Sequence, residues 1–222
     1  MKKITVIALH GFLGQGRDWE AVRAASRANA NWICPDLSAS GSCFEPPDVE
    51  GPCWLAGYSF GARLALRWMQ NAPDRYRGAL LLSANPGNFQ TDDERAARRA
   101  SDENWASRFR KDAWDDLTTA WNAQEIFGRQ PAPERIESDF DRAKLATVLT
   151  EFSVADQFTD SLRLPSRITW LAGSRDKKFC MLLDDMRHAG FPGSFLRIEG
   201  AGHRLLSEAP EAVAVALDDL VA

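Results

Sequence analysis

Residues 57–61 read Gly-Tyr-Ser-Phe-Gly and have the spacing of a segment that presents a nucleophilic serine. An apolar run at 53–56 precedes them and a helical pattern begins at Phe60, so Ser59 stands between a strand and a helix. Side chains beside so sharp a turn would collide, and glycine therefore flanks the serine on both sides. The pattern predicts a nucleophile elbow that exposes the Ser59 hydroxyl.

A serine hydroxyl reacts poorly unless an imidazole takes its proton, and the chain has three histidines. His203 lies in a glycine-rich loop after the last predicted strand, which makes it the candidate general base. His10 directly follows the first predicted strand, where we expect it to hold its loop through hydrogen bonds. His188 falls late in a charged helix and has no predicted role.

A carboxylate must fix the tautomer of that imidazole. Asp176 follows the penultimate predicted strand, so that Ser59, Asp176 and His203 occur in the chain order Ser, Asp, His of the α/β-hydrolases. Asp184 and Asp185 are alternatives, but they lie inside a predicted helix, where solvated surface charge explains them better. We therefore predict Asp176 as the acid.

Two backbone N–H groups are expected to form the oxyanion hole that accompanies such a serine. One belongs to Phe60, which follows Ser59, and the other to Phe12 in the His-Gly-Phe-Leu-Gly loop at 10–14. A glycine-rich loop after a strand could instead bind phosphate. Residues 10–16 match neither the dinucleotide fingerprint nor a P-loop, so nucleotide binding is not expected.

Short apolar runs rich in β-forming residues alternate along the chain with helical patterns. The runs lie at 4–9, 32–34, 53–56, 79–82, 168–171 and 195–198, and the helical patterns at 14–30, 60–71, 179–189 and 208–221. This alternation predicts an α/β fold of the α/β-hydrolase type, with a mostly parallel central sheet and helices on both faces.

Two segments break the alternation. Residues 37–52 contain three prolines and leave room for little more than one helical turn in a crossover that normally carries a helix. Residues 85–163 lack strand patterns but contain helical ones at 92–110, 112–127 and 139–152, the first with Thr91 as N-cap. We predict a core of residues 1–84 and 164–222 with a helical lid at 85–163; a plain surface embellishment is the alternative.

Composition excludes several classes of partner. Of 222 residues, 27 are Lys or Arg and 31 are Asp or Glu, and a net charge of −4 gives no basic field for nucleic acid or an anionic membrane. Only six residues separate Lys3 from His10, which suits a strand rather than a signal peptide. No apolar run approaches the ~18 residues of a membrane span. We expect a cytoplasmic protein.

The cysteines show neither paired spacing nor a histidine at metal-ligand distance along the chain. Cys34, Cys43, Cys53 and Cys180 are therefore interpreted as structural thiols. Nothing in the sequence indicates a metal or an organic cofactor, and nothing in it specifies an oligomeric state.

Arg63 is a candidate residue for binding the substrate. It lies four residues after Ser59 on the first turn of the predicted helix, so the two side chains could share the face toward the pocket. An arginine there would clamp a carboxylate. The alternative is a solvated helix face that Arg63 shares with Arg67.

The chain resembles 2-succinyl-6-hydroxy-2,4-cyclohexadiene-1-carboxylate synthases of menaquinone biosynthesis, which are lyases with the α/β-hydrolase fold. The elbow and histidine motifs of the resemblance are shared with many hydrolases. The arginine after the elbow and the Pro-Gly segment followed by Glu-Arg-x-x-Arg are more particular. The matching segments are 10–14, 18–19, 57–63, 85–90, 93–98, 102–106, 121–127, 173–179 and 201–203.

The resemblance implies that Ser59, activated by histidine, removes a proton from the substrate, which then eliminates pyruvate. Such a substrate is a small anion with several carboxylates, so the pocket needs local cations. The resemblance implies Arg63 as one and Arg95 or Arg98 as another. It also implies that the side chains lining the site include Tyr58, Gln90 and Trp121.

The sequence departs from the family pattern at a few positions. Ala62 stands where a second glycine is usual, and Leu206 stands where a second histidine is often found. A further lid arginine is expected before 145–149, where Arg135 and Arg142 only flank the position. Two other functions therefore stay open: a serine carboxylesterase or thioesterase acting on a small ester or thioester, and a binding protein without catalysis.

Overall fold

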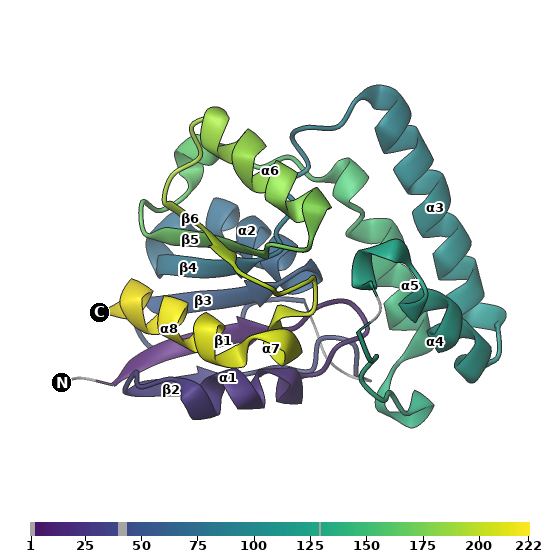
Figure 1. The fold of residues 1–222 in the computed structure, drawn as a ribbon, viewed down its shortest axis with the longest axis horizontal. Coiled ribbons are helices and arrows are strands. Elements are labelled where there is room, and N and C mark those ends of the chain that lie inside the picture. Colours follow the sequence, from purple (N-terminus) through teal and green to yellow (C-terminus); the bar gives the residue numbers. More distant parts are fainter. Residues whose placement is uncertain (1–2, 40–43, 129) are drawn as a thin grey trace.

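A computed structural model describes residues 3–39, 44–128 and 130–222. In this part of the chain, six parallel strands form one sheet in the order β2-β1-β3-β4-β5-β6 (Figure 1). The strands are β1 (Ile4–Leu9), β2 (Ala30–Ile33), β3 (Cys53–Tyr58), β4 (Tyr76–Leu82), β5 (Ile168–Gly173) and β6 (Ser194–Ile198). The α/β fold predicted from the alternating pattern is confirmed.

Helices cover both faces of the sheet, as a parallel sheet requires. On one face pack α2 (Phe60–Asn71) and α6 (Lys177–His188), and on the other α1 (Glu20–Ala25) and α8 (Pro210–Val221). Successive strand residues supply the two cores in turn, as the pleat dictates. In β1, for example, Ile7 belongs to the first core and Val6 to the second.

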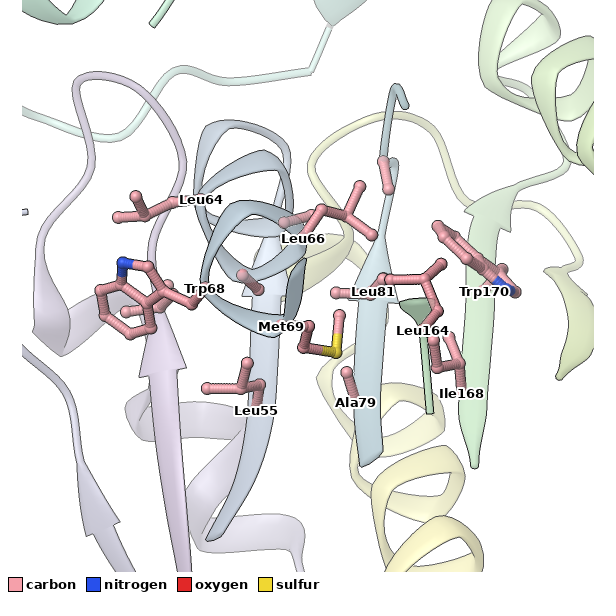
Figure 2. Packing of buried hydrophobic residues seen from close by; sticks show 14 of the residues in the cluster. Leu55, Leu64, Leu66, Trp68, Met69, Ala79, Leu81, Leu164, Ile168 and Trp170 are labelled. Carbon is pink, nitrogen blue, oxygen red and sulfur yellow. The ribbon is translucent and has the colours of Figure 1, made fainter. Parts of the chain in front are cut away.

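The core under α2 ties this helix to the strands that surround the elbow. Figure 2 shows Leu66 and Met69 of α2 facing Leu55, Ala79 and Leu81 of β3 and β4. All five side chains are fully buried. The helix that begins at the serine is thereby fixed over the centre of the sheet.

The helix predicted at 14–30 is wrong in extent. The chain forms a 3₁₀ turn (η1, Gly16–Trp19) and then α1, which ends at Ala25. The reason lies in α8: Asp218 accepts hydrogen bonds from the Ser26 hydroxyl (2.6 Å) and from the Arg27 and Ala28 amides (2.8 and 3.2 Å). These hydrogen bonds hold residues 26–28 outside the helix, so that the chain leads into β2.

The helix predicted at 60–71 has the bounds of α2, and the other predicted helices form with shifted ends. The last one begins at Pro210 rather than at Glu208, and an unpredicted turn, α7 (Leu205–Glu208), precedes it. The described residues of 37–52 contain no helix and no strand, as the prolines indicate. Among the described residues no helix is long and apolar enough to cross a membrane. Cys34, Cys53 and Cys180 are free thiols, and Cys43 lies outside the described residues.

Helices fill the segment between β4 and β5. Figure 1 shows α3 (Asp92–Lys111), α4 (Trp114–Asn122) and α5 (Arg142–Glu151) beyond the carboxyl ends of the strands. Thr91 and Glu94 form the predicted capping box at the start of α3. The remaining short 3₁₀ helices are η2 (Pro73–Arg75), η3 (Glu125–Phe127), η4 (Glu137–Asp139), η5 (Val154–Asp156) and η6 (Ser161–Arg163).

These helices have their own apolar core, which includes Phe109 of α3, Leu117 of α4 and Leu145 of α5. Leu13, from the loop after β1, is buried in the same core. The inserted segment therefore packs on the loop that carries Phe12. Its role as a lid with boundaries 85–163 stays a prediction.

The central core yields a stability prediction. Replacing the fully buried Leu66 with alanine leaves a cavity between α2 and the sheet, and we expect the free energy of unfolding to fall by about 2–5 kcal/mol. Urea denaturation followed by circular dichroism measures this change. Val215→Ala on α8, where the side chain is 59% exposed, is the control and should change stability by less than about 0.5 kcal/mol. Equal effects of the two substitutions would contradict the packing described.

Candidate active site

Ser59 occupies a strained turn between β3 and α2. Its backbone angles are φ 52° and ψ −106°, a conformation that residues other than glycine rarely adopt. The Ser59 amide donates to the Leu82 carbonyl of β4 (2.9 Å), and its carbonyl accepts from the Arg63 amide (3.2 Å). Such strain, on the order of 1–3 kcal/mol, persists only where the surroundings enforce it. The predicted elbow is thus present.

Both flanking glycines are required by close approach of the backbone. A Cβ atom at Gly61 would lie 2.2 Å from the Leu9 carbonyl oxygen, and one at Gly57 would lie 2.6 Å from the Ala62 Cα. These contacts are far shorter than carbon atoms tolerate. The glycines therefore allow α2 to start directly against β1, with the serine at the carboxyl edge of the sheet.

His203 and Asp176 form a buried pair. The His203 Nδ1 lies 2.6 Å from the Asp176 Oδ2, and the residues are only 4% and 6% exposed. Asp176 also caps α6, where its Oδ1 accepts from the Phe179 amide (3.3 Å). A carboxylate beside Nδ1 holds the proton there and leaves the Nε2 lone pair free to accept another. Ser59 and His203 line the same cavity.

Aromatic rings surround the imidazole of His203. The ring centroids of Phe179, Tyr58 and Phe127 lie 5.0, 5.5 and 5.8 Å from that of His203. Burial raises the pKa of the Tyr58 hydroxyl, so this residue stays neutral over the working pH range. The imidazole is therefore enclosed by aromatic rings that limit access of water.

The residues that carry the two predicted oxyanion donors line the same cavity. Phe60 is the first residue of α2, where a backbone amide has no partner within the helix. Phe12 lies in a tight turn in which the Gly14 amide donates to the Gly11 carbonyl (3.0 Å). Both phenylalanines line the cavity with Ser59. Their function as an oxyanion hole stays a prediction that this placement favours.

Two arginines bring positive charge to the cavity. Arg63 donates to the Phe152 carbonyl at the end of α5, and Arg98 donates from Nε to Asp102 on α3 (2.8 Å). Burial, and then the nearby Arg98, lower the pKa of Arg63 to about 9, so this guanidinium remains charged at neutral pH. Asp102 also accepts from the Ser153 hydroxyl (2.7 Å), which fixes its carboxylate in place.

Of the other predicted binding residues, Tyr58 and Trp121 line this cavity, but Gln90 and Arg95 do not. Arg95 donates to the Ala155 carbonyl instead (3.3 Å). Of the two arginines offered by the resemblance, Arg98 thus lines the cavity that Ser59 lines, and Arg95 does not. The alternative acid Asp184 pairs with Arg197 (2.6 Å) at the surface.

Sequence reasoning missed Lys178 and several neutral lining residues. Lys178 stands two positions after Asp176, so its place next to the acid is the signal that could have indicated it. Burial and then Arg98 lower the pKa of its ammonium group. The neutral lining side chains that were missed include Asn85, Ser101, Trp105, Gln124 and Ile126.

His10 is a fully buried structural residue, as expected. The Leu37 amide donates to its Nε2 (2.8 Å), so Nδ1 carries the proton and donates to the Gly11 carbonyl (2.7 Å). Burial is the main reason that the pKa of His10 lies below its usual 6.5. The neutral imidazole joins the loop of Phe12 to the segment that follows β2.

Known proteins are similar to this chain over nearly all of its length. Residues 6–216 match the family described as "Alpha/beta hydrolase family". The chain belongs to this family. A 2-succinyl-6-hydroxy-2,4-cyclohexadiene-1-carboxylate synthase from Citrobacter koseri is 28% identical over 97% of this chain and 93% of its own. A protein of the same name from Klebsiella pneumoniae is 30% identical over 98% and 93%.

Among solved structures, one described as "Structure of MenH from S. aureus" is similar to this chain with a TM-score of 0.81. It covers 100% of this chain and 94% of its own at 18% identity, and therefore shows a shared fold. Together with the two synthases, it confirms the family resemblance found in the sequence.

The buried His10 predicts a pH dependence of stability. As pH falls below about 6.5, the unfolded chain takes up a proton on His10 but the native protein does not, so the free energy of unfolding decreases. The slope approaches about 1.4 kcal/mol per pH unit for one proton. His10→Gln preserves an acceptor and a donor but cannot titrate.

We therefore expect wild type to lose about 1 kcal/mol more than His10→Gln between pH 7 and pH 5.5. Urea denaturation at several pH values measures this difference. All other side chains are the same in the two proteins, so their contributions cancel in the comparison. Parallel pH profiles would show that His10 is not held neutral.

Proposed function

We propose that this protein is a carbon–oxygen lyase that forms 2-succinyl-6-hydroxy-2,4-cyclohexadiene-1-carboxylate. Its substrate would be an enolpyruvyl cyclohexene with several carboxylates, from which pyruvate is eliminated. The observation that carries the proposal is that Arg63 and Arg98 share one cavity with Ser59 and His203. A pocket for a neutral ester has no need for two guanidinium groups beside its serine, whereas a polyanion does.

The proposed reaction begins with a proton relay. His203 Nε2 accepts the Ser59 hydroxyl proton while Asp176 stabilises the imidazolium that forms. The Ser59 oxygen takes a proton from a ring carbon of the substrate. The electron pair of that C–H bond forms a ring double bond, and the C–O bond to the enolpyruvyl group breaks. The leaving group departs as the enolate of pyruvate and is protonated on carbon by the proton that His203 holds, which returns Ser59 and His203 to their starting states.

The cations serve to position and stabilise anionic groups. Arg63 lies four residues from Ser59 on α2, so a carboxylate held by its guanidinium stands close to the reacting oxygen. A hydrogen bond between charged groups contributes about 1.5–3 kcal/mol, more than one between neutral groups. The amides of Phe12 and Phe60 would stabilise negative charge that develops on the substrate.

The proposal is tested by following pyruvate release from the enolpyruvyl substrate with a coupled dehydrogenase. Ser59→Ala should abolish release, because it removes the oxygen that takes the substrate proton in the proposed relay. Arg63→Gln should lower kcat/KM by about 10- to 100-fold, the equivalent of one charged hydrogen bond.

Arg67→Gln is the matched control. Arg67 lies one turn further along α2, does not line the cavity and stacks on the Phe152 ring, with 4.7 Å between its Cζ and the ring centroid. It should change kcat/KM by less than about 2-fold. If wild type releases no pyruvate but hydrolyses p-nitrophenyl esters, and Arg63→Gln leaves that hydrolysis intact, the protein is an esterase and the proposal is wrong.

A further inference from the structure

A second cavity lies directly behind the aromatic wall of the candidate active site. The two cavities share lining residues from the loop after β1, the elbow and the inserted segment: Gly11, Phe12, Tyr58, Trp121 and Phe127. Apolar side chains such as Leu13, Pro133 and Leu206 form much of the remaining wall of the second cavity. Charged groups placed there are poorly hydrated, so their interactions with a bound ligand are strong.

Arg204 is one of two guanidinium groups on this wall. It follows His203 directly, is only 7% exposed and lies over the Phe127 ring, with 4.3 Å between its Cζ and the ring centroid. Its hydrogen bonds go to neutral oxygens, the Gln130 carbonyl (3.1 Å) and Asn122 Oδ1 (2.6 Å). No carboxylate within the described chain pairs with its guanidinium.

The carboxylate of Glu208, four residues after Arg204, is occupied elsewhere. It accepts hydrogen bonds from the Gly202 and Arg204 amides (2.8 and 3.1 Å) and pairs with Arg175 (2.7 Å). Burial is the main reason that the pKa of Arg204 is lowered, and the charge of Arg135 contributes in the same direction. The Arg204 charge is thus held in place without a direct counter-ion.

Arg135 is the second guanidinium. It pairs with Asp18 through Nη2 (2.7 Å), and its Nη1 donates to Gln15 (3.3 Å). Its side chain is 8% exposed, and its Nε is buried with no acceptor among the described residues. Two arginines therefore face one carboxylate, that of Asp18, and the wall carries one uncompensated positive charge.

We propose that this second cavity binds a carboxylate group between Arg204 and Arg135. A carboxylate would supply the missing counter-ion of Arg204 and accept the unused Nε hydrogen of Arg135. Either an arm of the substrate held in the neighbouring cavity or a separate small carboxylate would provide it. Binding of a substrate arm rests on the proposed function. The shared aromatic wall favours this source, because a ligand whose apolar body packs against Trp121 and Phe127 would reach both cavities.

Isothermal titration of the intact protein with succinate tests the site without any turnover. Wild type should bind succinate, and Arg204→Gln should weaken binding by at least about 10-fold, the loss of one charged hydrogen bond. Arg197→Gln, at the surface in a pair with Asp184, is the control and should bind as wild type does. Weakening by Arg63→Gln but not by Arg204→Gln would place succinate beside Ser59 and overturn the proposal.

A crystal of the wild type soaked in succinate covers the case in which Arg204→Gln fails to fold. A succinate carboxylate within hydrogen-bond distance of the Arg204 guanidinium supports the proposal, and an empty second cavity at saturating succinate overturns it. Arg204→Lys, which keeps the charge but not the planar fork, should bind succinate more weakly than wild type and more tightly than Arg204→Gln.

Kinetics with the enolpyruvyl substrate distinguish the two sources. If a substrate arm enters the second cavity, Arg204→Gln raises KM for pyruvate release by at least about 10-fold and leaves kcat within about 2-fold. If Arg204→Gln loses succinate binding but keeps the wild-type KM for pyruvate release, the ligand is a separate small carboxylate. If wild type releases no pyruvate, the proposed function has failed, and the succinate titration still decides whether the second cavity binds a carboxylate.

Discussion

The site depends on one backbone constraint, the turn at Ser59, which places the start of α2 against the end of β1. A positive φ at a serine is costly, and it is maintained here because the Leu82 carbonyl holds the Ser59 amide and no side chain fits at Gly57 or Gly61. The fully buried core beneath α2 prevents the helix from moving away to relieve the strain. The position of the serine is therefore set by the sheet rather than by a flexible loop.

Charge gives that serine its proposed chemistry. The placement of Ser59, His203 and Asp176 is compatible with ester hydrolysis or with proton abstraction, since one fold supports many reactions. Arg63 connects the elbow helix to the Phe152 carbonyl, and Arg98 is held by Asp102, which Ser153 fixes in turn. Arg63 is thus positioned by a contact between the core and the insertion, and Arg98 by contacts within the insertion. The proposed binding of an anionic substrate and the packing of the insertion onto the core therefore share Arg63.

The sequence predicted those parts of the structure that local rules determine. The elbow, the strands, the Thr91 cap and the chain order of Ser59, Asp176 and His203 follow from periodicity and from the needs of a tight turn. Helix ends that depend on distant partners were missed, as with Asp218 drawing Ser26 out of α1. The family resemblance implied Gln90, and Arg95 as an alternative to Arg98, but neither Gln90 nor Arg95 lines the cavity, whereas Lys178 does. Tertiary packing determines which face of an inserted helix lies toward the sheet. The spacing of residues along the sequence does not predict that face.

In the proposed reaction Ser59 acts as a base rather than as an attacking nucleophile. The most direct measurement is the kinetic isotope effect on kcat/KM for pyruvate release, comparing the substrate with one deuterated at the ring carbon that loses its proton. Proton abstraction by Ser59 predicts a clearly slower reaction of the deuterated substrate. Equal kcat/KM values for the two substrates, with a covalent adduct on Ser59 in the mass spectrum, would contradict the account.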